Sequence, residues 1–292
     1  MSDRPNLGFI GIGLMGESIT RRLLERGWRV SVWNRETERL ETVVPFGATP
    51  LDSPAVVAEN SDIVLMCVLD TPAVEACVFG ANGVLHAGRP PKLIVDFSTI
   101  NPAATRDFAA RLRRECGTGW VDAPISGGPD AAREGKMAVF AGGAIADVDA
   151  VRPMMDHLAA NFTRMGDVGA GQTTKIINQA IVGTGFVVMA EALALAERSG
   201  IDAATLPNCL AGGFADSSLL RRIYPQMQAR AFDPPKGYAR QLLKDMQALS
   251  DFARNLGLQL PMVETALQQY VAHVEAGNGM KDTASIIDRY RG

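Results

Sequence analysis

Cysteine and histidine are scarce in this chain of 292 residues, which has four cysteines and three histidines. The four cysteines, Cys67, Cys77, Cys116 and Cys209, form no C-x-x-C pair and have no metal-ligand spacing. The histidines lie outside every motif described below. We therefore expect neither a disulfide framework nor a metal site.

The sequence also lacks a basic run, a signal peptide and a long uncharged apolar run. Its formal net charge is -3, so neither nucleic acid nor an anionic membrane is an expected partner. The first residues lead into a strand pattern without the apolar region of a signal peptide. No run of about 18 uncharged apolar residues is present to span a bilayer. These absences favour a cytoplasmic protein with small-molecule ligands.

The first half of the chain alternates short apolar runs with helical patterns such as Glu17–Arg26 and Pro102–Arg114. The runs expected to form strands are Leu7–Ile10, Arg29–Trp33, Asp62–Val68, Lys92–Asp96, Trp120–Asp122 and Lys136–Ala141. Such alternation implies right-handed crossovers between parallel strands. It predicts an α/β domain over residues 1–165, with a doubly wound sheet of the Rossmann type.

Strand patterns end at about residue 165, and a helical half begins. Residues 170–199 contain no proline and predict one helix of about 45 Å, long enough to join two domains. Further helices are expected between breaks at Gly212-Gly213, Pro234-Pro235 and Pro261. Residues 166–292 are therefore predicted to form an all-α C-terminal domain attached through this long interdomain helix.

A glycine-rich turn follows the first expected strand. The pattern G-x-G-x-x-G stands between a strand and a helix, which is the context that dinucleotide binding requires. The first glycine permits the tight turn, the second lets backbone amides approach a pyrophosphate, and the third allows close packing of helix on strand. The cofactor-binding residues expected in this turn are Gly11, Gly13, Leu14, Met15 and Gly16.

The end of the second strand indicates which nicotinamide cofactor is preferred. An acidic residue there would bond the ribose 2′-hydroxyl and repel a 2′-phosphate. This chain has Asn34 and Arg35 instead, with Arg39 nearby. The Arg35 guanidinium can pair with a 2′-phosphate and lie on the adenine face. The prediction is NADP(H) in preference to NAD(H).

Two further segments carry candidate substrate chemistry. Ser126, Gly127 and Gly128 follow a strand, and the two glycines expose backbone amides that can hold a carboxylate. Lys175 lies near the start of the long helix with Asn178 and Gln179 three and four residues later, on one helical face. A partly desolvated lysine can give a proton to the alkoxide that forms when hydride reduces a carbonyl.

The sequence resembles the β-hydroxyacid dehydrogenase family, whose best-known members include 3-hydroxyisobutyrate dehydrogenase, over nearly its whole length. The resemblance is carried by five ordered segments, which are residues 8–16 (GFIGIGLMG), 96–102 (DFSTINP), 122–128 (DAPISGG), 169–179 (GAGQTTKIINQ) and 244–246 (KDM).

The resemblance implies roles for several of these residues. Ser126, Gly127 and Gly128 would bind the substrate acid group, and Lys175 would be the proton donor. Lys244, in the second lysine motif, would approach the nicotinamide end of the cofactor. Leu69 and Thr99 match positions that line the cofactor, and the family commonly forms homodimers or homotetramers through its helical half.

The chain departs from the commonest pattern at Gln179, where most of the family carries asparagine. The Asn178-Gln179 version resembles the branch of tartronate semialdehyde (2-hydroxy-3-oxopropionate) reductases. This predicts NADPH-dependent reduction of tartronate semialdehyde to D-glycerate, with catalytic roles for Lys175, Asn178 and Gln179.

Other functions stay open at this point. The substrate can instead be 3-hydroxyisobutyrate or 4-hydroxybutyrate, because pocket side chains decide between short hydroxy acids. Imine reductases share the architecture but usually replace the lysine, so Lys175 argues against them. A non-catalytic NADPH-binding module is the alternative from another functional class.

Overall fold

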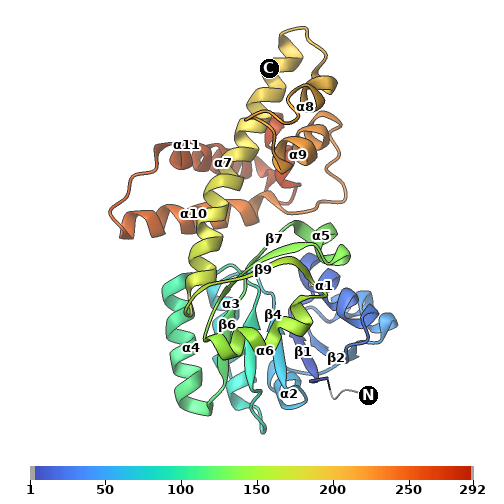
Figure 1. Ribbon diagram of the computed structural model, residues 1–292, viewed down its shortest axis with the longest axis vertical. Coiled ribbons are helices and arrows are strands. Elements are labelled where there is room, and N and C mark those ends of the chain that lie inside the picture. Colours follow the sequence, from blue (N-terminus) through green and yellow to red (C-terminus); the bar gives the residue numbers. More distant parts are fainter. Residues whose placement is uncertain (1–3, 291–292) are drawn as a thin grey trace. The chain divides into compact units, whose positions relative to one another are not determined.

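The computed structural model describes residues 4–290 and divides into two units, one ending at Lys175 and the other starting at Ile176 (Figure 1). This division falls within the long helix α7 (Ala170–Arg198), later in the chain than the boundary expected at residue 165. The reason is that the first turn of α7 bonds to strand ends of the first unit, as described below.

The first unit contains the sheet. Within the described residues its nine strands are β1 (Leu7–Ile10), β2 (Val30–Trp33), β3 (Thr49–Pro50), β4 (Ile63–Met66), β5 (Leu93–Asp96), β6 (Gly119–Asp122), β7 (Ile125–Ser126), β8 (Met137–Gly142) and β9 (Ala159–Gly166). The order is β3-β2-β1-β4-β5-β6-β8-β7, and β9 pairs with β8. The first six strands are parallel, which confirms the doubly wound fold class. The sheet is mixed rather than fully parallel, because β8 runs antiparallel to β6 and β7.

Helices cover both faces of this sheet (Figure 1). Their bounds are α1 (Leu14–Glu25), α2 (Pro54–Glu59), α3 (Thr71–Phe79), α4 (Pro102–Cys116), α5 (Gly128–Glu134) and α6 (Ile145–Met155). Side chains of α1, α5 and α6 share one apolar core with the sheet, and those of α2, α3 and α4 share the other. Strands buried on both sides explain why their sequences are continuous apolar runs instead of alternating ones.

The parallel strands end together. Ile10, Met66, Asp96 and Asp122 are successive partners in the registers that join β1, β4, β5 and β6. The loops that follow these strands therefore emerge at one edge of the sheet. In open α/β sheets this carboxyl edge is where ligands bind.

The second unit is helical. Beside the rest of α7 it contains α8 (Leu206–Cys209), α9 (Ser218–Gln228), α10 (Ala239–Asn255) and α11 (Pro261–His273). The expected breaks are confirmed, since Gly212-Gly213 and Pro234-Pro235 lie between helices and Pro261 starts α11. Tyr224, Tyr270 and Met246 are fully buried in the core of this unit.

Short helical segments of other types complete both units. They are the 3₁₀ segments Thr37–Thr42, Val44–Phe46, Val84–His86, Ala203–Thr205 and Thr283–Tyr290, and the π segment Val274–Asn278.

Within residues 4–290, α7 is the one helix whose length and composition would suffice to cross a bilayer. The sequence was expected to contain no such segment. The helix is long enough and its mean hydropathy is high enough to cross a bilayer, although Glu191 interrupts its apolar stretch. A core helix of a soluble protein meets the same criterion, and Ala190 and Leu193 of α7 are fully buried in the core of the second unit.

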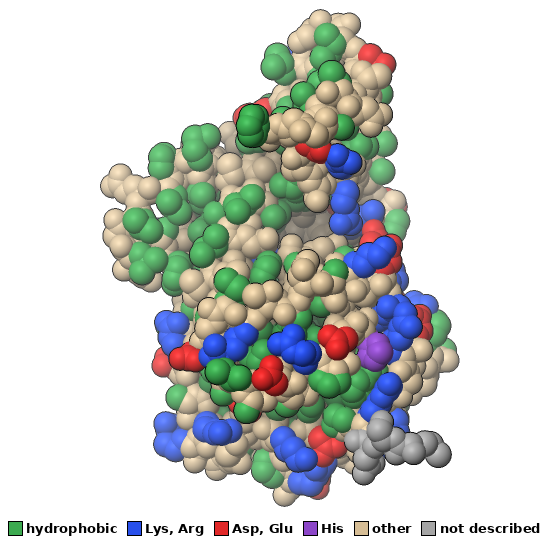
Figure 2. Space-filling view, in the orientation of Figure 1, with side chains coloured by type: hydrophobic (Ala, Val, Ile, Leu, Met, Phe, Trp, Pro, Cys, Tyr) green, Lys and Arg blue, Asp and Glu red, His purple; other side chains and the backbone are tan. Residues whose placement is uncertain are grey.

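Apolar side chains are also exposed on the second unit. Figure 2 shows them gathered over the region of α10 and α11. The large exposed side chains of the turn between these helices and of the start of α11 are Leu256, Leu258, Leu260 and Met262. Ile177, Ile181, Val188 and Leu195 are exposed along α7. Isolated exposed apolar residues are normal, but a series of this kind is typical of an interaction surface.

Candidate active site

The glycine-rich turn has the geometry that its sequence predicts. Gly11 has φ +99°, and its amide donates to the Trp33 carbonyl at 2.9 Å. A Cβ on Gly16 would lie 1.9 Å from the Gly11 carbonyl oxygen, so only glycine lets α1 begin this close to β1. A Cβ on Gly13 would meet nothing within 4 Å. The open space beside Gly13 therefore fits a ligand that approaches the backbone, as a dinucleotide pyrophosphate does.

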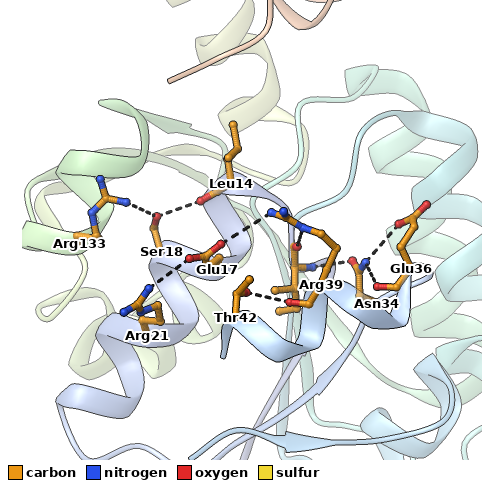
Figure 3. A network of polar contacts seen from close by, with 10 residues as sticks. Leu14, Glu17, Ser18, Arg21, Asn34, Glu36, Arg39, Thr42 and Arg133 are labelled. Atoms are coloured by element: carbon orange, nitrogen blue, oxygen red, sulfur yellow. Dashed lines mark hydrogen bonds and ion pairs between the residues drawn. The ribbon is translucent and has the colours of Figure 1, made fainter. Parts of the chain in front are cut away.

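Asn34 holds this turn in place. Its buried carboxamide accepts a hydrogen bond from the Ile12 amide at 2.8 Å and donates to the Glu36 carbonyl at 2.8 Å (Figure 3). The Arg39 guanidinium donates to the Ile12 carbonyl at 3.2 Å and lies 3.8 Å from the Glu17 carboxylate. Asn34 thus supports the turn through a neutral side chain at the position where an acid would favour NAD(H).

Arg35 lies in solvent at the end of β2. Its side chain is 83% exposed and pairs with the Glu36 carboxylate at 2.7 Å. The hydrogen bond from Arg35 lowers the pKa of Glu36 below its usual value. The guanidinium is accessible to a phosphate, although Glu36 competes for it.

The other expected cofactor residues of the first unit also follow strand ends at the carboxyl edge. Leu69 comes after β4 and is half exposed, and Thr99 comes after β5. Because β1, β4 and β5 end in register, both residues lie on the same edge as the glycine-rich turn. Their predicted role in lining the cofactor stays a prediction.

The Ser-Gly-Gly loop joins β7 to α5. Gly127 and Gly128 both have positive φ, +130° and +74°, which side chains rarely adopt. A Cβ on Gly128 would meet nothing within 4 Å, so space is open in front of this backbone. Ser126 pairs with Ala138 of β8, which fixes the start of the loop on the sheet. The loop can present a hydroxyl and backbone amides to an anionic group.

Lys175 is brought next to this loop. The side chain is buried, at 8% exposure, and its Nζ donates to the Ile125 carbonyl at 2.9 Å. Ile125 immediately precedes Ser126, so the ammonium group is bonded to the segment that leads into the loop. Two elements that are far apart in sequence, residues 125–128 and Lys175, therefore form one polar cluster in the first unit.

Two polar residues that sequence reasoning did not assign to the site hold α7 beside the strand ends. Asp122 accepts from the amides of Gly169 and Gln172 at 2.8 and 2.9 Å. The Gln172 side chain donates to the Ser98 carbonyl at 2.8 Å and accepts from the Ile100 amide at 3.1 Å. The available signal was a single acid at the end of an apolar strand, four residues before Ser126 of the Ser-Gly-Gly motif.

The remaining candidates lie in the second unit. Asn178 donates to Gln179 at 3.0 Å, and Gln179 donates to the Asp245 carboxylate at 2.7 Å. Lys244 pairs with the same carboxylate at 3.0 Å. The structure thus joins Gln179 to the Lys244-Asp245 pair, a contact that the sequence did not predict. Asp245 thus orients the Gln179 amide.

A mostly parallel sheet with this glycine-rich turn, and a lysine beside a second glycine loop at its carboxyl edge, defines an NAD(P)-dependent dehydrogenase. Comparison with protein families agrees. Residues 6–166 match the NAD binding domain of 6-phosphogluconate dehydrogenase, and residues 169–290 match the NAD-binding domain of NADP-dependent 3-hydroxyisobutyrate dehydrogenase. The chain belongs to the 3-hydroxyisobutyrate dehydrogenase-like group of the β-hydroxyacid dehydrogenase family.

Individual relatives span almost the whole chain. It is 35% identical to 2-hydroxy-3-oxopropionate reductase from Escherichia coli, covering 96% of this chain and 95% of that protein. It is 30% identical to L-threonate dehydrogenase from Cupriavidus necator, covering 98% and 96%. The crystal structure of 3-hydroxyisobutyrate dehydrogenase from Salmonella typhimurium superposes with a TM-score of 0.87 at 28% identity, covering 97% and 99%. The family is thus shown, whereas relatives of similar identity act on different hydroxy acids.

The glycine-rich turn gives a paired prediction. Valine at Gly13 would enter open space from an ordinary extended backbone (φ -86°, ψ -166°), so the fold is expected to be unaffected. It would fill the space for the pyrophosphate and weaken cofactor binding at least about tenfold, a loss of about 1.4 kcal/mol. Alanine at Gly16 would instead overlap the Gly11 carbonyl and destabilise the fold by about 1–3 kcal/mol.

Thermal unfolding and cofactor titration by fluorescence, measured on both variants, separate the two effects. Wild-type cofactor affinity in Gly13→Val would show that the pyrophosphate does not approach this glycine.

Proposed function

We propose that this protein uses NADPH to reduce a short aldehyde that carries a carboxylate, with Lys175 as the proton donor, and that tartronate semialdehyde, reduced to D-glycerate, is its substrate. The observation that supports this proposal most directly is the bond from Lys175 Nζ to the Ile125 carbonyl at 2.9 Å, beside the Ser126–Gly128 loop. An ammonium group and an anion-binding loop side by side match a substrate with a carbonyl next to an acid group.

The residues of the first unit have separate roles in the proposed reaction. The backbone amides of Gly127 and Gly128 and the Ser126 hydroxyl hold the carboxylate. When bound, NADPH supplies hydride to the carbonyl carbon. Lys175 gives a proton from Nζ to the carbonyl oxygen, and the resulting amine regains a proton from water. Before that transfer, the positive charge stabilises the developing alkoxide.

Asn178 and Gln179 are proposed as partners of Lys175 in this step. They follow Lys175 by three and four residues in the sequence, the spacing that favours one helical face. Neither amide titrates, so their role would be to hold the substrate oxygen and not to transfer a proton. Lys244, which pairs with Asp245, is proposed to contact the cofactor at its nicotinamide end.

The preference for NADPH is part of the proposal. Asn34 adds no negative charge where a 2′-phosphate would lie, and Arg35 is accessible at the end of β2. A neutral residue followed by an arginine fits a phosphorylated ribose better than a free ribose.

A panel of aldehydes tests the function. NADPH oxidation is followed at 340 nm with tartronate semialdehyde, methylmalonate semialdehyde, succinic semialdehyde and glyoxylate, and kcat/KM is compared. The highest value is expected for tartronate semialdehyde. A clear maximum for methylmalonate or succinic semialdehyde would assign a 3-hydroxyisobutyrate or 4-hydroxybutyrate dehydrogenase instead. Absence of turnover across the panel, with NADPH still bound, would favour a non-catalytic binding module.

A homodimer or homotetramer formed through the helical unit is also proposed. The exposed apolar side chains along α7 and between α10 and α11 support it, because a monomer would leave them in water. Light scattering coupled to size exclusion chromatography gives the mass in solution, and a monomer at micromolar concentration would contradict the proposal.

A further inference from the structure

A buried carboxylate fixes the start of the helix that carries Lys175. Asp122, at the end of β6, has no solvent exposure. Its two oxygens accept from two different amides, that of Gly169 directly before α7 at 2.8 Å and that of Gln172 in the first turn at 2.9 Å. The carboxylate thus satisfies amides that have no partner within the helix and places a negative charge at the positive end of its dipole.

The backbone around this carboxylate is packed too tightly for side chains. A Cβ on Gly171 would lie 2.3 Å from the Phe140 carbonyl oxygen and 2.5 Å from that of Asp122. A Cβ on Gly142 of β8 would lie 2.6 Å from the Asp122 carboxylate. The glycines let α7 reach the strand ends, and the hydrogen bonds hold it there.

The same short segment then holds the lysine itself. Residues 122–125 run from the end of β6 to the start of β7, and α7 bonds to both ends of the segment. Asp122 binds the first turn of α7, and the Ile125 carbonyl accepts from Lys175 Nζ one turn later, at 2.9 Å. The position of the ammonium group therefore depends on where the first turn is held.

We infer that Asp122 is a positioning residue for the reduction: by holding the first turn of α7 it sets the position of Lys175 Nζ beside the Ser126–Gly128 loop. This inference rests on the proposed proton-donor role of Lys175. Asp122 needs no contact with substrate or cofactor for this role, and it acts through the helix.

The charge of Asp122 offers a readout that a purely structural cap would not give. Burial raises the pKa of this carboxyl to about 6. An acid whose pKa is raised in the folded state contributes stability that is complete below the unfolded value and lost as the pH rises through about 6. Protonation below pH 6 therefore does not weaken the fold, but it removes the charge that binds the two amides. A fall in turnover below pH 6 without unfolding would report the helix position.

Other charged groups lie on the elements around this carboxylate. Asp96 of β5 is its neighbour in register, and Lys175 is on α7 itself. Arg106 of α4 approaches Gly169, and Asp167 follows β9 with Arg164 paired to it. The pH dependence of turnover is therefore measured on the variant as well as on the wild type. These neighbouring groups are present in both proteins, so the difference between the two profiles reports Asp122.

The test is Asp122→Asn, which keeps the size of the side chain but removes its charge and one acceptor. We expect kcat to fall by about tenfold to hundredfold, as displacement of a catalytic group by about 1 Å can cause. NADPH affinity should be unchanged, and the fall in turnover below pH 6 should be absent. Reductive methylation of Lys175, quantified by peptide mass spectrometry without substrate, should become several-fold faster relative to Lys136.

Ser53→Ala is the matched control, because Ser53 caps α2 of the same unit by accepting from the Val56 amide at 3.2 Å. It should lower the melting temperature and leave kcat, the pH profile and Lys175 methylation unchanged. Wild-type kcat and methylation in Asp122→Asn would overturn the inference, and so would an equal loss of kcat in the Ser53 control.

If Asp122→Asn does not fold, Gly171→Ala provides the second variant, because its Cβ would push the first turn from the strand ends. The same loss of kcat and faster methylation are expected, and wild-type values would overturn the inference. Methylation requires no substrate, so it decides the position of Lys175 even if the wild type reduces no aldehyde, which would contradict the proposed function alone.

Discussion

Replacing Lys175 by alanine is expected to lower kcat by about 10²–10⁴-fold, the range typical for loss of a general acid. The reason is that Nζ, bonded to the Ile125 carbonyl at 2.9 Å, is the proton donor nearest the Ser126–Gly128 loop in the proposed mechanism. NADPH affinity should stay close to wild type, because the glycine-rich turn and Arg35 are not altered. Stopped-flow turnover and a fluorescence titration of NADPH measure the two quantities separately.

Two further lysine variants separate proton transfer from the effect of positive charge and provide a control. Lys175→Arg retains a positive charge but cannot release a proton near neutral pH, so its kcat should also be low. Lys136→Ala is the control, because Lys136 is an exposed lysine that pairs with Glu134. Full activity in Lys175→Arg would indicate a purely electrostatic role, and full activity in Lys175→Ala would remove the residue from the mechanism.

Replacing Arg35 by aspartate is expected to reverse the cofactor preference. The change removes a charge-assisted bond to the 2′-phosphate, worth about 1.5–3 kcal/mol, and adds repulsion. NADPH should therefore bind about 10–100-fold more weakly, since each 1.4 kcal/mol corresponds to about a factor of ten. NADH should bind as well or better, because an acid can accept from the free 2′-hydroxyl. The ratio of kcat/KM for the two cofactors is the measurement.

Glu36 allows an opposite variant at the same place. Its carboxylate pairs with Arg35 at 2.7 Å and would compete with a bound phosphate for the guanidinium. Glu36→Gln should therefore increase the preference for NADPH moderately. Arg111→Asp serves as the charge control, because Arg111 pairs with Glu115 on α4, outside the glycine-rich turn and the end of β2. An unchanged cofactor ratio in Arg35→Asp would show that other residues select the cofactor.

The expected strands at β1, β2, β4, β5, β6 and β8 are confirmed to within a few residues. β1, β4, β5 and β6 are buried along their whole length, which favours continuous apolar runs, whereas β2 and β8 alternate between buried and partly buried residues in their first four positions. The strands that were missed lie at the edges of the sheet. β3 and β7 are two residues long, and β9 has only exposed and partly buried side chains, so none of the three gives a strong apolar signal.

The sequence located the motifs proposed for the site but not the residues that support them. The glycine-rich turn, the Ser-Gly-Gly loop and Lys175 were all assigned from residue types and spacing, and the structure places the first two at the carboxyl edge of the sheet and Lys175 beside the loop. Asp122 was read only as part of a motif. Its function as the acceptor for the first turn of α7 depends on residues 169 and 172, which are close to it in space alone.

The sequence by itself determined the alternation of strands and helices, the dinucleotide turn and the family, since each depends on neighbouring residues or on a fixed spacing. Only the tertiary structure decided that Lys175 bonds to Ile125, that Gln179 bonds to Asp245 and that the division between the units falls inside α7. The bond between Lys175 and Ile125 joins residues 50 positions apart, and the bond between Gln179 and Asp245 joins residues 66 positions apart. Their formation depends on the packing of whole elements, which no local pattern records.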